Sequence, residues 1–183
     1  MKIILGVTGE IAGGKGALAN HVKEKYNGSV HRFSSVLRDI ARRMHLEENR
    51  SNLQKISTIF RENFSSNILS EVVYHDVMED EHEIIVIDGV RRIDDIEYLK
   101  KLPEFKLVYI EANIDTRYER IIRRRENSDD AEKTYEEFKA DNEKEAELQI
   151  RDLKNYANFT IDNEGTFLEF YHQIDSIIDG LRK

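Results

Sequence analysis

The sequence predicts a single α/β domain built on a parallel sheet with helices on both faces. Three short and almost continuous apolar runs, at residues 2–8, 84–89 and 106–112, have the pattern of strands buried on both faces. Segments with helical periodicity separate these runs, and the alternation continues through the chain. The 183 residues are enough for one domain with a substantial core.

Two weaker strands are expected in addition, at residues 30–33 and 158–162. Helical periodicity predicts the helices that connect the strands, at residues 15–26, 36–44, 50–79, 94–102, from 115 onward and 166–181. Ser34 or Ser35 is expected to cap the second helix. Residues 131–150 have helical propensity but few apolar anchors. The parallel sheet would have right-handed crossovers.

Composition and charge narrow the functional classes. The net charge of −8 gives no reason to expect nucleic acid or an anionic membrane as a partner. The chain has no Cys, so disulfides and thiolate chemistry are excluded. No apolar run approaches a membrane span, and the first residues predict a strand, not a signal peptide, so we expect a cytoplasmic protein. A monomer and a homodimer both remain open.

A glycine-rich segment between the first strand and the first helix predicts a phosphate-binding loop. Its glycines let the backbone surround an anion with N–H groups, and the helix N-terminus adds positive potential. The lysine can reach the β- and γ-phosphates of ATP. The loop consists of Gly9, Glu10, Ile11, Ala12, Gly13, Gly14, Lys15, Gly16 and Ala17.

The residues after the lysine are unusual. Most such loops have a Ser or Thr there, whose hydroxyl binds Mg²⁺, and Gly16 and Ala17 have no hydroxyl. Two interpretations are open. Either water and phosphates hold the Mg²⁺, or the loop binds the nucleotide without transferring a phosphoryl group.

The loop resembles that of adenylate-kinase-type nucleotide kinases, which carry Gly-Lys-Gly followed by Thr. Ala17 departs from that pattern. The whole chain is most similar to an uncharacterised archaeal group related to adenylate and dephospho-coenzyme A kinases. The resemblance implies a P-loop NTPase fold, a three-layer α/β/α sandwich with a five-stranded parallel sheet, that uses ATP and Mg²⁺. It also implies a core of residues 1–33, 76–124 and 151–183, a helical acceptor-binding insertion at about 34–75 and a lid at about 125–150.

Two further segments resemble the acceptor and metal side of these kinases. "SSVLRD" at 34–39 is similar to the segment in which an arginine meets the acceptor phosphate, and Arg38 matches that arginine. "IVIDGVRR" at 85–92 is similar to a strand that ends in Asp-Gly. There, Asp88 matches the acid that holds Mg²⁺ through water, and Arg91 or Arg92 matches a phosphate-binding arginine. An acid directly after an apolar strand also suits the ligand-binding edge of a sheet.

The remaining segments resemble the nucleotide side. "RYERIIRRR" at 117–125 is similar to the helix that leads into the lid, and Arg120 and Arg124 match arginines that stack near the base and contact phosphates. "IDNEG" at 161–165 is similar to the turn lining the adenine pocket, which implies that Asn163 and Gly165 contact the nucleotide. For Arg117 and Arg123, a solvated helix face and an anion site are both open. Arg151 could return to the phosphates from beyond the lid.

These features predict ATP-dependent phosphoryl transfer to a small phosphorylated acceptor. A nucleoside monophosphate is the first choice. Dephospho-coenzyme A is the alternative acceptor, although its kinases usually carry an Asp-containing motif where this chain has 33–35. A third interpretation, from a different class, is a regulatory protein that binds ATP and has no transferase activity, which Gly16 and Ala17 would favour.

Overall fold

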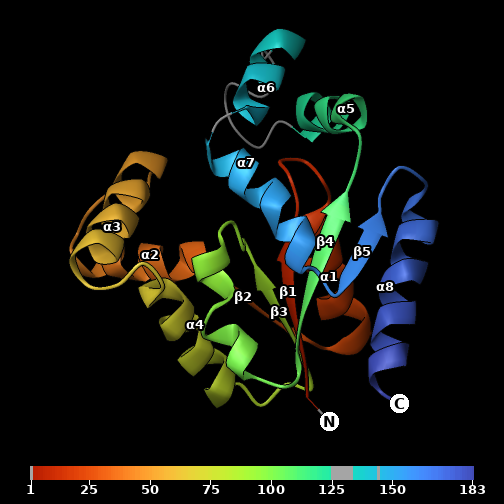
Figure 1. The fold of residues 1–183 in the computed structure, drawn as a ribbon, viewed down its shortest axis with the longest axis horizontal. Helices are drawn as coiled ribbons and strands as arrows, with labels where there is room; N and C mark the ends of the chain where they lie inside the picture. The colour runs from red at the N-terminus through yellow and green to blue at the C-terminus, as the bar shows by residue number, and fades with distance from the viewer. Residues whose placement is uncertain (1, 125–133, 144) are drawn as a thin grey trace.

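A five-stranded parallel sheet forms the centre of the computed structural model, which describes residues 2–124, 134–143 and 145–183. The strands lie in the order β2-β3-β1-β4-β5 (Figure 1). Helices cover both faces, so the expected three-layer α/β/α sandwich is confirmed. The strands are β1 (Ile3–Thr8), β2 (Ser29–Arg32), β3 (Ile84–Asp88), β4 (Phe105–Glu111) and β5 (Phe159–Asp162).

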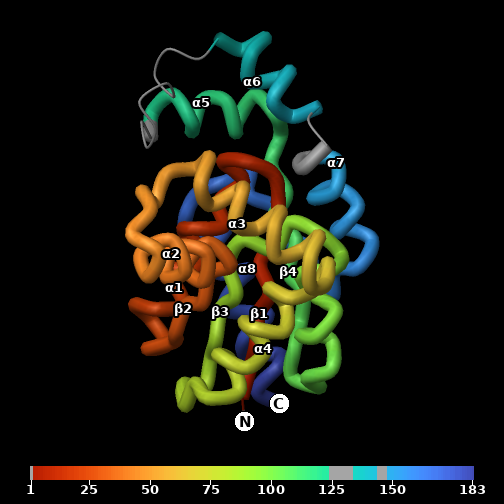
Figure 2. The backbone as a smooth tube through the Cα atoms, turned by 90° about the vertical axis from the view of Figure 1, so that its left-hand side faces the viewer, coloured from red at the N-terminus to blue at the C-terminus, as the bar shows by residue number. Residues whose placement is uncertain are grey.

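Eight α-helices and three 3-10 helices surround the sheet in the described part of the chain. α5 and α6 stand above the carboxyl ends of the strands, as the rotated view shows (Figure 2). No helix in the described part of the chain is both long and apolar enough to cross a membrane. The α-helices are α1 (Lys15–Tyr26), α2 (Phe33–Arg43), α3 (Arg50–Asn63), α4 (Ile68–Glu79), α5 (Ile114–Arg124), α6 (Tyr135–Asn142), α7 (Glu145–Asp152) and α8 (Phe167–Leu181). Three 3-10 helices are η1 (Ile93–Ile96), η2 (Leu99–Lys101) and η3 (Leu153–Tyr156).

Two separate apolar cores explain why the strand sequences are apolar without alternation. Along β1, Ile4 belongs to the core shared with α2, α3 and α4, whereas Ile3, Leu5 and Val7 belong to the core shared with α1 and α8. Successive residues of a strand point to opposite faces of the sheet. A strand covered by helices on both sides therefore needs apolar residues at every position.

The start of the second helix differs from the expectation. Phe33 begins α2 instead of ending β2, and the N-cap residue is Arg32, with no side-chain cap hydrogen bond. The expected caps, Ser34 and Ser35, thus lie inside the helix. Phe33 is 6% exposed and packs in the core beside Leu37. We infer that burial of its ring, which hydroxyl capping patterns do not reflect, determines where the helix begins.

The expected helix at 94–102 is wrong, because the chain forms the two 3-10 helices η1 and η2 there. The Asp95 carboxylate accepts hydrogen bonds from the amides of Arg91 and Arg92, at 2.9 Å and 3.0 Å. These bonds fix a tight turn after β3. The predicted insertion boundary at 75 falls inside α4, and the predicted lid lies partly outside the described residues, so that division of the domain remains a prediction.

A buried ion pair joins α3 to this turn. Arg61 of α3 donates from Nη2 to Asp95 Oδ1 at 2.6 Å, and the two side chains are only 10% and 4% exposed. Arg61 also donates to the Ser66 carbonyl and, at 3.3 Å, to the Ser57 hydroxyl. Asp95 is thus the common acceptor for α3 and for the turn that carries Arg91 and Arg92.

We predict that Asp95→Ala lowers the free energy of unfolding by about 3 kcal/mol, because it leaves the buried Arg61 guanidinium and two amides without their acceptor. Asp39→Ala is the matched control. Asp39 pairs with Arg42 at 2.9 Å, but both side chains are more than half exposed, so its loss should change stability by less than about 0.5 kcal/mol. Urea denaturation measures both, and equal effects would contradict the role given to Asp95.

Candidate functional site

Two glycines of the predicted phosphate loop have backbone angles that other residues rarely adopt. Gly9 has a φ of +144° and Gly14 a φ of +114°. A Cβ at Gly9 would collide with the Ile110 carbonyl oxygen, and a Cβ at Gly14 would collide with the Asn163 side-chain amide. Both positions therefore require glycine, for conformation and for space.

Gly16 is different. A Cβ placed there would meet nothing within 4 Å among the described residues, although the residue lies in the first turn of α1. The side of the loop at Gly16 is therefore open, in the first turn of a helix. Backbone N–H groups and positive potential meet at such a position, which suits an anion.

The Lys15 side chain folds back over the loop. Its Nζ donates to the carbonyl oxygens of Gly9 and Glu10, at 2.5 Å and 2.9 Å. The ammonium group is therefore held at the mouth of the loop by two neutral acceptors, where bound phosphate oxygens could replace them.

Asn163 supports the loop from the end of β5. Its side-chain amide donates to the Gly13 carbonyl at 2.8 Å, its backbone amide donates to the Glu111 carbonyl, and it is 4% exposed. Gly165 lies two residues further, just before the N-cap of α8. The "IDNEG" turn thus lies against the loop. Whether Asn163 and Gly165 contact a nucleotide remains a prediction.

α5 packs against the same turn. Glu164 accepts from the Asn113 amide and from the Thr116 hydroxyl. Burial opposes ionisation, but these hydrogen bonds lower the pKa of Glu164. Arg120 donates from Nη2 to the Asn163 carbonyl at 2.6 Å, whereas its Nη1 is buried and has no hydrogen-bond partner in the described part of the chain. A buried guanidinium donor without an acceptor, next to the loop, fits a bound anion.

The residues predicted on the metal and acceptor side follow the ends of β2 and β3. Asp88 is level with Val7 of β1 and with Arg32 of β2, and Arg32 Nε donates to Asp88 Oδ2 at 3.1 Å. Arg38 donates to the Ser34 hydroxyl and lies 3.8 Å from a Glu48 carboxylate oxygen. The four arginines of this region are all exposed: Arg32, Arg38, Arg91 and Arg92.

Glu10 and its partners connect the loop to α5, α6 and α7. The Glu10 carboxylate pairs with Arg117 at 3.3 Å and with Arg151 at 2.9 Å, and both arginines also bind Asn142. We call Glu10, Arg117, Asn142 and Arg151 the Glu10 cluster. Arg117 is 3% exposed, so the solvated-face interpretation is wrong for it, whereas the Arg123 side chain is 79% exposed. The Arg124 side chain lies outside the described residues.

The cluster also affects a tyrosine on β4. Burial raises the pKa of Tyr109 to about 12, and the carboxylates of Glu10 and Glu111 add to the shift. Two features of the site were absent from the sequence predictions. One is the Arg32–Asp88 pair, which depends on strand register. The other is the pairing of Glu10 with arginines, for which an acid in an anion-binding loop was the only available signal.

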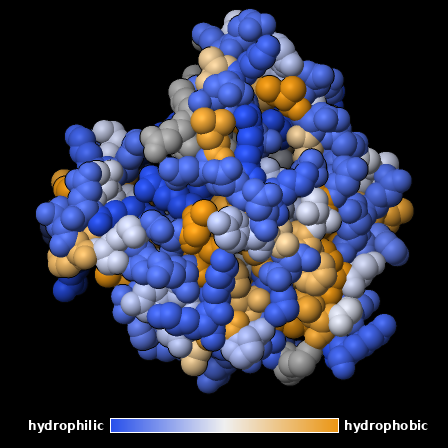
Figure 3. Space-filling model, viewed as in Figure 1, coloured by the Kyte–Doolittle hydropathy of each residue, from blue (hydrophilic) through white to orange (hydrophobic). Residues whose placement is uncertain are grey.

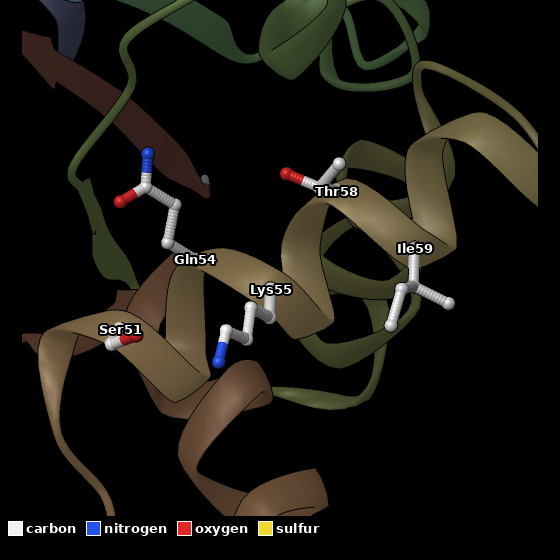
Figure 4. Close-up of a pocket in the computed structure, with 5 residues that line it drawn as sticks. All are labelled: Ser51, Gln54, Lys55, Thr58 and Ile59. Atoms are coloured by element: carbon white, nitrogen blue, oxygen red, sulfur yellow. The ribbon is translucent and has the colours of Figure 1, made fainter.

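A shallow pocket lies on α3, lined by Ser51, Gln54, Lys55, Thr58 and Ile59. Gln54 and Thr58 point to one side of the helix, and Lys55 and Ile59 point to the other (Figure 4). Gln54 and Thr58 are exposed, and their side chains make no hydrogen bond to other described residues. Hydrophilic side chains also dominate the surface between α3 and the α5–α7 region (Figure 3). The side chains of Gln54 and Thr58 could therefore form hydrogen bonds with a polar ligand in the α3 pocket.

No group of three or more His, Asp or Glu side chains able to hold a metal occurs among the described residues. Asp88 lies level with Val7, one residue before the end of β1. One carboxylate can contribute to a Mg²⁺ site that is completed by water and substrate phosphates.

We predict opposite outcomes for two alanine substitutions in the loop. Gly14→Ala should lower the free energy of unfolding by about 2 kcal/mol, because it combines a positive φ with a collision against Asn163. Gly16→Ala should leave stability unchanged within about 0.5 kcal/mol or raise it, since the Cβ has room and alanine favours a helix. Thermal unfolding without nucleotide measures both, and a destabilised Gly16→Ala would contradict the open space described above.

Comparison with known proteins agrees with this architecture. A UPF0200 protein of Hyperthermus butylicus is 27% identical over 180 residues, which cover 98% of this chain and 95% of that protein. A shikimate kinase of Bacteroides thetaiotaomicron has a TM-score of 0.59 at 14% identity, covering 97% of this chain and 98% of its own. A shikimate kinase of Acinetobacter baumannii, solved in complex with shikimate, has a TM-score of 0.55 at 16% identity, with 98% and 94% covered. These structures share the fold. A family model described as AAA domain matches residues 9–139, so the chain belongs to that family and has a P-loop kinase-like fold.

Proposed function

We propose that this protein transfers a phosphoryl group from ATP to a nucleoside monophosphate. The observation that carries the proposal is the position of the loop. It follows β1, next to β3, and Asp88 and the exposed Arg38, Arg91 and Arg92 follow β3 and the edge strand β2. Phosphoryl transfer needs positioning and positive charge more than covalent chemistry from the protein. This site offers both in a chain of net charge −8.

Each residue of the donor side has a role in this proposal. Bound ATP·Mg²⁺ would supply the phosphoryl group that is transferred. Lys15 would exchange the Gly9 and Glu10 carbonyls for phosphate oxygens and neutralise developing charge. Asp88 would hold Mg²⁺ through water. The buried Nη1 of Arg120 would donate a hydrogen bond to the nucleotide. Arg124 would contact phosphates.

The acceptor side is proposed from the arginines and from α3. Arg38 and either Arg91 or Arg92 would bind the phosphate already present on the acceptor, since a guanidinium matches two phosphate oxygens at once. Gln54 and Thr58 would contact the rest of the acceptor through their free amide and hydroxyl groups. The adenylate-kinase resemblance supports a monophosphate, and dephospho-coenzyme A is the alternative acceptor.

One observation favours a different class of function. The first turn of α1 contains no hydroxyl at Gly16 or Ala17, so a protein that binds ATP without transferring phosphate would have the same loop. Turnover measurements separate the two classes.

We predict that Lys15→Met abolishes phosphoryl transfer while the fold survives, because the Lys15 ammonium donates to the Gly9 and Glu10 carbonyls at the loop mouth and is not part of the apolar cores. Asp88→Asn should lower turnover about a hundredfold, and Ala17→Thr should lower it less than twofold. Steady-state kinetics across a Mg²⁺ titration, with circular dichroism as the folding control, tests all three. Normal turnover by a folded Lys15→Met variant would remove the donor-site assignment.

We also predict that the protein uses a nucleoside monophosphate and not the matching nucleoside. The panel consists of AMP, GMP, CMP, UMP, the deoxy forms, the matching nucleosides, dephospho-coenzyme A and shikimate, each with ATP·Mg²⁺. Arg38→Lys should raise KM for the acceptor about tenfold and leave ATP binding unchanged, since lysine lacks the two-point geometry. Arg43→Lys, another exposed arginine of α2, is the control. Product from dephospho-coenzyme A or shikimate alone would replace the proposed acceptor, and no product from any acceptor, with tight ATP binding, would favour the regulatory class.

A further inference from the structure

Glu10 places a carboxylate inside a loop that is otherwise built to bind anions. It is the second residue of the loop, and its backbone carbonyl accepts a hydrogen bond from Lys15 Nζ at 2.9 Å. Its side chain is 16% exposed and faces two arginines. Lys15, which is proposed to bind the β- and γ-phosphates, contacts the Glu10 backbone carbonyl, so residue 10 borders the terminal-phosphate end of the proposed site. An acid there opposes a bound triphosphate unless its charge is already paired.

The two arginines of the Glu10 cluster differ in how firmly they are held. Arg117 is buried and also donates to the Ala112 carbonyl at 3.0 Å, to the Ile11 carbonyl at 3.3 Å and to Asn142 Oδ1 at 2.6 Å. These acceptors fix Arg117 whether or not Glu10 is present. Arg117 therefore forms the rigid part of the cluster.

Arg151 has much more freedom. Its side chain is 37% exposed, and besides Glu10 it donates to the Asn142 carbonyl at 3.1 Å and to Glu143 at 3.3 Å, whose own side chain is 64% exposed. The shortest of its hydrogen bonds is the one to Glu10, and that bond raises the pKa of Arg151. Glu10 is thus the main group that holds Arg151 beside the loop, while solvent exposure leaves the guanidinium able to change partner.

Resting on the function proposed above, we propose that Glu10 is a positioning residue that competes with the terminal phosphate of ATP for Arg151. In the free protein the carboxylate holds Arg151 next to the loop. A γ-phosphate carries more negative charge than a carboxylate and takes over the guanidinium in two-point fashion. ADP has no phosphate at that place, so Arg151 stays on Glu10. Glu10 therefore lowers the affinity for ATP selectively and delivers Arg151 in the right place for transfer.

Calorimetric titration with a non-hydrolysable ATP analogue and with ADP tests this inference. In Glu10→Gln, we expect the Kd of the ATP analogue to fall about fivefold and that of ADP to change less than twofold, because only the triphosphate has to take Arg151 from the Glu10 carboxylate. Glu111→Gln is the matched control. Glu111 pairs with Lys154 at 2.8 Å, is half exposed, and should change neither affinity.

A second variant keeps the test decisive if Glu10→Gln does not fold. Arg151→Gln removes the more exposed partner and should weaken the ATP analogue but not ADP. Where both single variants fold, Glu10→Gln should no longer favour the ATP analogue in the Arg151→Gln background. Equal tightening of both nucleotides, or an undiminished effect in that background, would overturn the inference.

The two proposals can fail separately. If the parent protein binds the ATP analogue but transfers no phosphate to any acceptor, the proposed function fails and the comparison of nucleotide affinities still decides the role of Glu10. If transfer is normal and Glu10→Gln shows no ATP-selective change, the role of Glu10 fails alone. Binding of neither nucleotide by the parent overturns both.

Discussion

The hydrogen bond from the Asn163 side chain to the Gly13 carbonyl determines the shape of the phosphate loop. It joins residues 150 positions apart, and the same amide occupies the space that a side chain at position 14 would need. Asn163 also binds the Glu111 carbonyl and accepts from Arg120. One buried residue, through its side chain on Gly13 and its backbone on Glu111 and Arg120, therefore links the loop, the end of β4 and α5.

The features that the sequence predicted correctly each depend on a local pattern of residues. Strands β1, β3 and β4 could be predicted because burial on both faces requires continuous apolar runs. The loop could be predicted because no residue other than glycine fits at positions 9 and 14. The start of α2 could not, since burial of Phe33 overrides hydroxyl capping. The Arg32–Asp88 pair depends on strand register, and the burial of Arg117 depends on how α6 packs. Neither is encoded in local spacing.

The charges of the site follow one pattern. Arg32 is paired with Asp88, Arg38 lies near Glu48, and Arg151 is paired with Glu10. In each case the arginine is partly or largely exposed and its partner comes from a different element of the chain. Such exposed pairs contribute little to folding stability. They instead keep guanidinium groups ordered without an anion, while a phosphate can displace the carboxylate at small energetic expense.

The position of α8 has a consequence for the order in which the protein is made. Phe170, Ile174 and Ile178 of α8 are at most 1% exposed, in the same core as Ile3 and Leu5 of the first strand. During synthesis the first strand and the loop leave the ribosome long before β5 and α8 exist. The nascent loop has neither its supporting amide nor a closed core beneath it. The loop therefore reaches its folded shape only after β5 and α8 have joined the sheet.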